Sequence, residues 1–347
     1  MQILIATPKQ QNKTQGNQIT AFRWARLLEE LGHGVAIACE PDPDEISKAN
    51  PDVLIALHAT RNSRTIVRAA KRFPQIATVV IMTGTDLNVD LAKDPSNAKF
   101  RQAFESLEKA THIVLLEPAS LEQLRKVDAR FADKAVVIAQ SASTVNPSED
   151  EINALPDAFG IADTFKVAVV GHLRAVKDPL AATEAARLLP DQSRVHVIQW
   201  GAALDESLAE EANRETEKNR RYDWIGPVGH QQSLTQLQQC DVMVLSSHFE
   251  GGPAVLSESI VNDVPIIAHK IVATCGLLGD DYPGFYRNAD RQELADLMFK
   301  AEQDSDFLKL LSDRGDNLKE RFSESTESKA IENLITRLRQ TPDAMSH

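Results

Sequence analysis

The chain has few cysteines and lacks any long apolar run. Its three cysteines, Cys39, Cys240 and Cys275, are scattered, with neither the spacing of metal ligands nor an even number for a disulfide set. This usage fits a reducing compartment, so we expect a cytoplasmic protein. Residues 1–6 predict a strand rather than a signal peptide, because no basic region precedes a long apolar one. No apolar run is long enough to span a bilayer, so we expect no stable membrane association.

The glycine-rich turn of dinucleotide-binding enzymes is also missing. Residues 8–17, after the first predicted strand, contain one glycine, and no Gly-x-Gly-x-x-Gly follows any other strand. We therefore expect no dinucleotide. We also assign no other cofactor to this chain. We identify no Asp-x-Asp triplet that would bind a diphosphate through a metal ion, so we also expect no metal site. The net charge of −12 disfavours broad binding to nucleic acid, and an anionic substrate would need local basic groups.

What the chain does have is a regular alternation of β-branched runs and amphipathic segments, repeated over two regions. This pattern predicts an α/β protein with parallel sheets covered by helices on both faces. Strands are predicted at 3–7, 35–39, 53–57, 78–82, 113–116, 135–139, 166–170, 195–199, 241–245 and 265–268. Helices are predicted at 19–31, 63–73, 98–110, 121–127, 179–189, 204–218, 233–239, 253–262, 291–301, 304–321 and 324–339.

Prolines and an acidic cluster interrupt this rhythm in the middle of the chain. We predict a first doubly wound, Rossmann-like domain at 1–145. A linker at 146–164 follows, and then a second such domain at 165–323. A helix and tail are predicted at 324–347. The two domains are expected to face a central cleft, because ligands of doubly wound sheets bind beyond the carboxyl ends of the strands.

The second domain carries basic and glycine residues at such strand ends. In the loop at residues 171–179, Arg174 and Lys177 are expected to clamp a pyrophosphate, and Asp178 to cap the next helix. The alternative is a solvated loop that carries two bases. A later loop, at Gly226, is expected to hold a flat base with its backbone groups.

Two glutamates eight positions apart, Glu250 and Glu258, flank the start of another predicted helix. The glycines between them, Gly251 and Gly252, let backbone N–H groups approach a ligand closely. Pro253 suits a first helical turn, and the helix start adds positive potential that favours a phosphate or a sugar hydroxyl. The alternative is two solvated carboxylates on an ordinary strand–helix unit.

The first domain has a histidine and a basic stripe after the strand at 53–57. Arg61 and Arg64 lie near the start of the next helix and are expected to collect an anionic acceptor. His58 is expected to act as an acid–base or hydrogen-bonding group. The alternatives are a solvated basic face and a histidine with only a structural role.

Two further loops of the first domain carry small polar residues. In the loop after residues 78–82, these residues suit close approach of the backbone to a ligand, although Asp86 is also suited to fixing the turn alone. The first loop of the chain is expected to contact phosphate. The acceptor-binding residues predicted in these two loops are Lys13, Gly16, Asn17, Thr83, Gly84, Thr85 and Asp86.

Taken together, these segments resemble the selenosugar synthase family (SenB) of selenoneine biosynthesis. The resemblance is carried by residues 21–28, 56–59, 83–87, 171–179, 250–252 and 276–284. It implies a GT-B fold, UDP-N-acetylglucosamine or UDP-glucose as donor, and selenophosphate as acceptor. The domain at 1–145 would then lie on the acceptor side, and the domain at 165–323 would bind the nucleotide sugar. Selenium would attack the anomeric carbon, UDP would leave, and loss of phosphate would give a 1-selenosugar. The resemblance also implies functional coupling to a selenophosphate synthetase and to a selenoneine-forming synthase.

The resemblance also implies roles for individual residues. Glu258 would bind the ribose hydroxyls, and Glu250 with the glycine amides would contact the transferred sugar or its phosphate. His172 stands where the wider group of GT-B enzymes has an arginine. The catalytic residues would be Lys177, Arg174, Glu250 and His58, and the donor-binding residues Gly171, His172, Gly226, Gly251, Gly252 and Glu258. Two other functions stay open: transfer to a hydroxyl acceptor, and non-catalytic sensing of a UDP-sugar.

Overall fold

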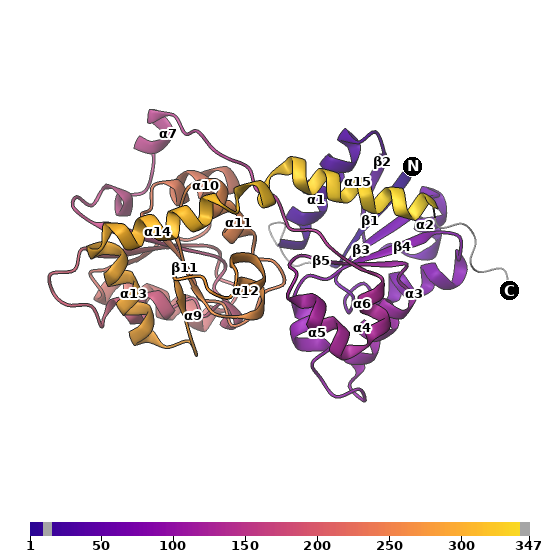
Figure 1. Ribbon diagram of the computed structural model, residues 1–347, viewed down its shortest axis with the longest axis horizontal. Coiled ribbons are helices and arrows are strands. Elements are labelled where there is room, and N and C mark those ends of the chain that lie inside the picture. The colour runs from indigo at the N-terminus through magenta and orange to yellow at the C-terminus, as the bar shows by residue number, and fades with distance from the viewer. Residues whose placement is uncertain (10–15, 341–347) are drawn as a thin grey trace. The chain divides into compact units, whose positions relative to one another are not determined.

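The computed structural model describes residues 1–9 and 16–340, which form two compact units (Figure 1). Unit 1 contains Met1–Gln140, Glu250–Gly252 and Glu324–His347. Unit 2 contains Ser141–Phe249 and Pro253–Ser323. None of the helices in the described part of the chain is long and apolar enough to cross a membrane.

Unit 1 is built on a six-stranded sheet whose strands are all parallel, in the order β2-β1-β3-β4-β5-β6. Its centre is a continuous apolar strand, Val53–Leu57, in which every residue is fully buried, as a strand covered on both faces requires. The strands are β1 Gln2–Thr7, β2 Gly34–Cys39, β3 Val53–Leu57, β4 Ala77–Ile81, β5 His112–Leu115 and β6 Ala135–Val137.

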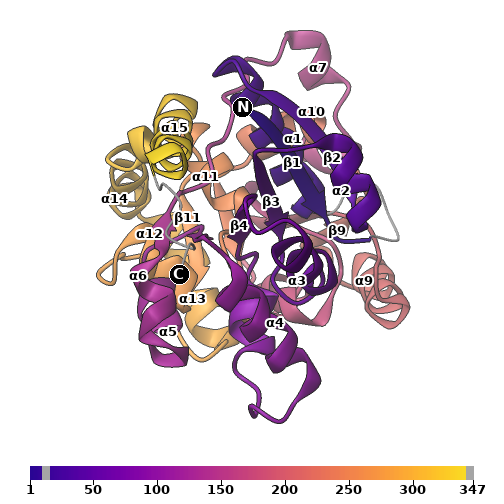
Figure 2. The ribbon, with the colours of Figure 1, turned by 90° about the vertical axis from the view of Figure 1, so that its right-hand side faces the viewer.

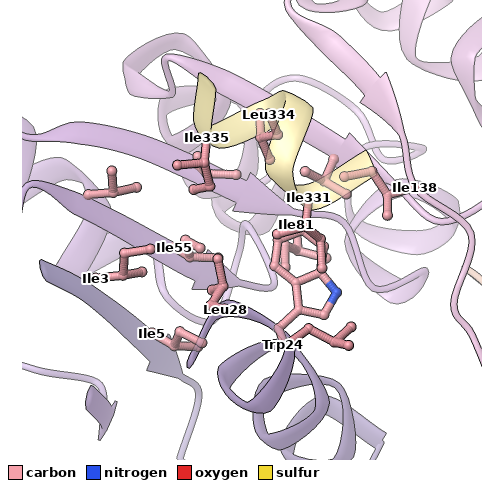
Figure 3. Packing of buried hydrophobic residues seen from close by; sticks show 14 of the residues in the cluster. Ile3, Ile5, Trp24, Leu28, Ile55, Ile81, Ile138, Ile331, Leu334 and Ile335 are labelled. Carbon is pink, nitrogen blue, oxygen red and sulfur yellow. The ribbon is translucent and has the colours of Figure 1, made fainter. Parts of the chain in front are cut away.

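Helices cover both faces of this sheet, and α3 and α4 pack side by side (Figure 2). On the other face, Trp24 and Leu28 of α1 pack with Ile331, Leu334 and Ile335 of α15 over the strands (Figure 3). The helical elements of unit 1 are α1 Gly16–Glu30, α2 Pro43–Ala49, α3 Ser63–Arg72, the π-helical turn η1 Asp86–Asp90, α4 Ala98–Lys109, α5 Ser120–Val127, α6 Ala129–Asp133 and α15 Glu324–Gln340.

Unit 2 has a second parallel six-stranded sheet, in the order β12-β11-β10-β7-β8-β9. This is the order of a doubly wound fold, and the direction of winding reverses between β10 and β7. The strands are β7 Phe165–Val170, β8 Val195–Trp200, β9 Tyr222–Trp224, β10 Val242–Leu245, β11 Ile266–His269 and β12 Phe285–Tyr286. The α/β class with two doubly wound sheets is therefore confirmed.

The helices of unit 2 differ in detail from the prediction. The predicted helix at 304–321 is divided into α14 and η4, with the break near Gly315, whose carbonyl accepts from the Leu318 N–H at 2.8 Å. The predicted linker contains two short helical turns. The elements are α7 Glu149–Asn153, η2 Asp157–Gly160, η3 Ala175–Lys177, α8 Ala181–Ala186, α9 Glu206–Lys218, α10 His230–Gln238, α11 Ala254–Val261, α12 Val272–Leu278, α13 Arg291–Gln303, α14 Ser305–Asp316 and η4 Lys319–Phe322.

Candidate active site

The predicted pyrophosphate loop lies where the winding of the second sheet reverses. Residues 171–178 follow β7, and residues 246–249 follow the neighbouring strand β10. In a doubly wound sheet, the loops after such a pair of strands diverge and leave room for a ligand. The fold thus brings Gly171, His172 and Lys177 to the carboxyl edge of the sheet, and Arg174 lies exposed in the same loop.

Gly171 and Gly201 allow the loop after β7 to pack closely against the loop after β8. A Cβ atom on Gly201 would lie 2.1 Å from the carbonyl oxygen of Gly171, and Gly201 has a φ of +146°. The loops are also joined by the Leu173 N–H, which donates to the Ala202 carbonyl at 2.9 Å. Only glycine fits at position 201, a residue that we did not predict for the site.

His172 takes part in the same contact. Its Nδ1 atom accepts from the Ala202 N–H at 3.0 Å. With Nδ1 acting as acceptor, the proton of the neutral ring is on Nε2. The histidine at the place of the usual arginine is therefore attached to the loop after β8.

The backbone of the pyrophosphate loop is fixed from the β10 side. The Ser246 hydroxyl donates to the carbonyls of Lys177 and Asp178, at 2.8 and 2.9 Å, and the His248 N–H donates to the Val176 carbonyl at 2.9 Å. Three successive carbonyls are thus held by one neighbouring segment. Ser246 and His248 were not predicted, because nothing in the local sequence indicates a contact with residues about 70 positions earlier.

The expected helix-capping role of Asp178 is wrong. Helix α8 begins at Ala181, and its cap residue Leu180 makes no side-chain hydrogen bond. The Asp178 carboxylate instead accepts two hydrogen bonds from the guanidinium of Arg291, each of 2.8 Å. The Asp178 carboxylate therefore pairs with Arg291, which is distant in the sequence, and not with the backbone N–H groups at the start of α8.

Glu258 lies on α11 and pairs with a histidine that the sequence did not single out. Its Oε1 atom is 2.9 Å from Nε2 of His230, and the Glu258 side chain is 13% exposed. His230 is the first residue of α10, shortly after the loop of Gly226, whose φ is +75°. The predicted ribose carboxylate and the predicted base loop are therefore neighbours within unit 2.

The other half of the glutamate motif, Glu250–Gly252, belongs to unit 1. A Cβ atom on Gly251 would lie 2.5 Å from the backbone nitrogen of Gly84. The Asn88 side-chain amide donates to the Glu250 carbonyl at 3.0 Å, and that of Gln140 to the Gly252 carbonyl at 2.5 Å. The predicted loop at 83–86 and the glutamate–glycine tripeptide thus pack together.

His58 directly follows β3, in a strained and buried position. Its φ is +73°, which is unusual for a residue other than glycine, and only 2% of the residue is exposed. Burial lowers the pKa of His58, and the nearby Asp86 opposes part of this shift, so the ring is neutral at pH 7. Its Nδ1 atom accepts from the Arg61 N–H at 3.3 Å, which leaves the ring proton on Nε2.

Asp86 holds the loop that was predicted to bind the acceptor. It is fully buried, and its carboxylate accepts from the N–H groups of Ala59, Thr83 and Gly84 at 2.9–3.0 Å. Of the two roles considered, this geometry favours fixing the turn, because a fully buried carboxylate is not accessible to a ligand. The side chains of Thr83 and Thr85 are half-buried in the same loop.

The remaining acceptor residues lie at two helix starts. Arg61 and Arg64 are exposed at the start of α3, while Gly16 and Asn17 begin α1. Because β1 and β3 are parallel neighbours, the helices that follow them begin at the same edge of the sheet. Lys13 lies outside the described residues.

Each Asp-x-Asp triplet in the described part of the chain lies at a helix start, and its first aspartate caps the helix. Asp42 and Asp304 are the N-cap residues of α2 and α14, and each accepts from two backbone N–H groups. Residues 1–9 and 16–340 contain no group of three or more His, Cys, Asp or Glu side chains that could hold a metal ion.

Comparison with known proteins gives a consistent result. Residues 152–325, half of the chain, match the model of the family described as glycosyl transferases group 1. Anabaena Alr3699/HepE, solved in complex with UDP and glucose, is 16% identical with a TM-score of 0.79, over 97% of this chain and 100% of its own. Sucrose-phosphate synthase from Thermosynechococcus elongatus is 14% identical with a TM-score of 0.79, over 98% and 99%. These likenesses confirm the predicted GT-B class of fold.

Proposed function

Because the chain belongs to the group 1 glycosyl transferases, we propose that it is a selenosugar synthase. It transfers the sugar of UDP-N-acetylglucosamine or UDP-glucose to selenophosphate. The new bond joins selenium to the anomeric carbon, and the bond from that carbon to the UDP oxygen breaks with its electron pair. Water then cleaves the selenium–phosphorus bond, which releases phosphate and the 1-selenosugar.

The observation that carries the donor assignment is the position of the Lys177 loop at the winding reversal of the second sheet. Departure of UDP leaves negative charge on the diphosphate, and Lys177, Arg174 and backbone N–H groups would stabilise that charge. Glu258 would bind the ribose hydroxyls. The complex of HepE with UDP and glucose supports a UDP-sugar as the donor.

Basic residues at the carboxyl edge of the first sheet support the proposal of an anionic acceptor. Arg61 and Arg64 lie at the start of α3, where the helix dipole adds positive potential. The acid–base or hydrogen-bonding role expected of His58 stays a prediction, because its ring is buried. Selenium in selenophosphate already carries negative charge, so its attack on the anomeric carbon requires no proton removal.

The proposed reaction has a defined place in a sequence of reactions. A selenophosphate synthetase must supply the acceptor, and a selenoneine-forming synthase would use the selenosugar. Neither step requires a stable complex with this chain.

The test is mass spectrometry of the purified protein mixed with selenophosphate and either UDP-sugar, without added metal. A selenium isotope pattern on a hexose or N-acetylhexosamine selenol, together with released UDP, is the expected product. EDTA should leave the rate unchanged, because protein groups stabilise the leaving charge. UDP-sugar binding without any selenium product would contradict the proposal and favour a hydroxyl acceptor or a sensor.

A further inference from the structure

The carboxylate next to Lys177 is held by an arginine of helix α13, which packs against α8. Arg291, the first residue of α13, donates from Nη1 and Nη2 to the two carboxylate oxygens of Asp178, at 2.8 Å each. Both side chains are largely shielded, with 27% and 13% exposed. A forked contact of this kind fixes the orientation of the carboxylate as well as balancing its charge.

Arg291 is itself held in place by its surroundings. Its Nε atom donates to Glu184 at 2.5 Å, and Nη1 also donates to the Ala289 carbonyl at 2.9 Å. Ala289 has a φ of +52°, an uncommon conformation for alanine that strains the loop before α13. The strained loop and these hydrogen bonds therefore hold the Arg291 guanidinium in one orientation.

The same loop is connected to the segment after β10. The Ala289 N–H donates to Nε2 of His269 at 3.1 Å, and Nδ1 of His269 donates to the Ser247 carbonyl at 3.0 Å. The neighbouring Ser246 hydroxyl binds the carbonyls of Lys177 and Asp178. The pyrophosphate loop and the Arg291 loop are thus fastened to one common segment.

The backbone at Asp178 is also in a special conformation. Its φ is +45°, in the left-handed region that asparagine and aspartate tolerate better than other residues with a side chain. The residue is therefore fixed by its backbone and by its carboxylate, directly after Lys177. A carboxylate in this place without a cation would repel a pyrophosphate and attract the Lys177 ammonium group.

We propose that Arg291 is a positioning residue for the pyrophosphate of the donor. By neutralising and orienting Asp178, it prevents this carboxylate from competing with phosphate for Lys177. This inference rests on the proposed function, because it assumes that the Lys177 loop binds the UDP diphosphate. It adds a residue in the last third of the chain that controls the affinity of that loop for phosphate.

The test uses calorimetric titration of the full chain with UDP and with UMP. Arg291→Met should weaken binding of UDP about tenfold and change binding of UMP much less, because the second phosphate is the group at stake. Adding Asp178→Asn, which removes the charge and suits the left-handed backbone, should restore UDP affinity to within about threefold of wild type. A role in packing alone predicts no such rescue.

The matched control is Arg187→Met, which breaks another arginine–glutamate pair of unit 2. Arg187 contacts Glu215 at 2.9 Å and is 45% exposed, and neither residue lies in the pyrophosphate loop. UDP affinity of this variant should equal that of wild type. If circular dichroism shows that Arg291→Met is unfolded, Arg291→Gln is used in its place. The same changes in UDP and UMP affinity are then expected.

Four results would overturn the inference. Wild-type affinity for UDP in Arg291→Met, or a double variant no better than Arg291→Met, would refute the positioning role and leave the donor site intact. Equal losses of UDP and UMP affinity would assign Arg291 to the nucleoside or to the fold. Absence of UDP binding by the wild-type protein would refute the proposed function, and this inference with it.

Discussion

At the scale of single residues, the candidate site contains side chains that the fold buries. His58 is buried, with a φ of +73°, and burial lowers its pKa. Asp86 is fully buried and holds backbone N–H groups. Strain and burial of this kind persist where the rest of the fold compensates for them, which is common at functional sites.

The lowered pKa of His58 predicts how stability depends on pH. Below about pH 6.5 the unfolded chain binds a proton at His58 that the folded chain does not, so stability is lost as the pH falls through that value. Asparagine tolerates the left-handed backbone at this position. The free energy of unfolding of His58→Asn should therefore fall less steeply as the pH is lowered, with a slope smaller by at most about 1.4 kcal/mol per pH unit. Urea unfolding between pH 5 and pH 8 measures this, and identical slopes would contradict it.

The donor residues give a second prediction at this scale. Lys177→Ala and Glu258→Ala should each raise the dissociation constant for UDP by about 10- to 100-fold, the usual loss for a charge-assisted hydrogen bond. Thermal unfolding should change little. Lys218→Ala, at the end of α9, is the control and should bind UDP normally. Unchanged UDP binding by both test variants would remove the donor-site assignment.

At the scale of elements, the loops at the carboxyl edge of each sheet are packed through glycines. Gly201 lies against Gly171, and Gly251 lies against Gly84. In each pair a Cβ atom would come within 2.6 Å of the opposing backbone, where real contacts are essentially never found. These loops therefore keep their shape only while Gly201, Gly84 and Gly251 lack a side chain.

The variant Gly201→Ala tests this packing. The added Cβ would lie 2.1 Å from the Gly171 carbonyl oxygen, so the loop after β7 must move. We expect a loss of about 1–3 kcal/mol in the free energy of unfolding and weaker UDP binding. Gly160→Ala is the control, because nothing lies within 4 Å of its added Cβ. Equal stability of the two variants would show that the loop adjusts freely.

At the scale of the whole molecule, the last helix completes unit 1. Glu327 of α15 is 2% exposed and accepts from Arg23 and from the indole of Trp24, at 3.0 Å each. The neighbouring apolar side chains, Ile331 and Leu334, enter the core over the first sheet (Figure 3). The helix is therefore held by apolar burial and by one buried ion pair.

The variant Glu327→Ala should lower the free energy of unfolding by about 3 kcal/mol, because removal of one partner leaves a shielded arginine without its carboxylate. The control is Glu324→Ala on the same helix. Glu324 pairs with Arg26, but both side chains are at least 40% exposed, so its loss should cost less than about 1 kcal/mol. Urea unfolding of both variants measures these losses. Similar losses of unfolding free energy would contradict a stabilising role for the buried Arg23–Glu327 ion pair.

Most strands were predictable, as was the position of the predicted site residues at the carboxyl edges of the sheets, while the partners of these residues were not. Long β-branched runs such as Val53–Leu57 predict buried strands, and the residues directly after them must lie at the carboxyl edge. Strands of two or three residues, such as Phe285–Tyr286, are too short to give a pattern. Ser246, His230 and Arg291 contact partners that are distant in the sequence, and no local spacing encodes such contacts.

Because α15 follows both sheets in the chain, it also leaves the ribosome after them. The first sheet is synthesised early, but the face over Trp24 and Leu28 stays uncovered until Ile331, Leu334 and Ile335 have been made. Unit 2, whose last residue is Ser323, can close its own core sooner. During synthesis, the unit that begins first is thus the one that is completed last, and its apolar face is the surface that a chaperone would meet.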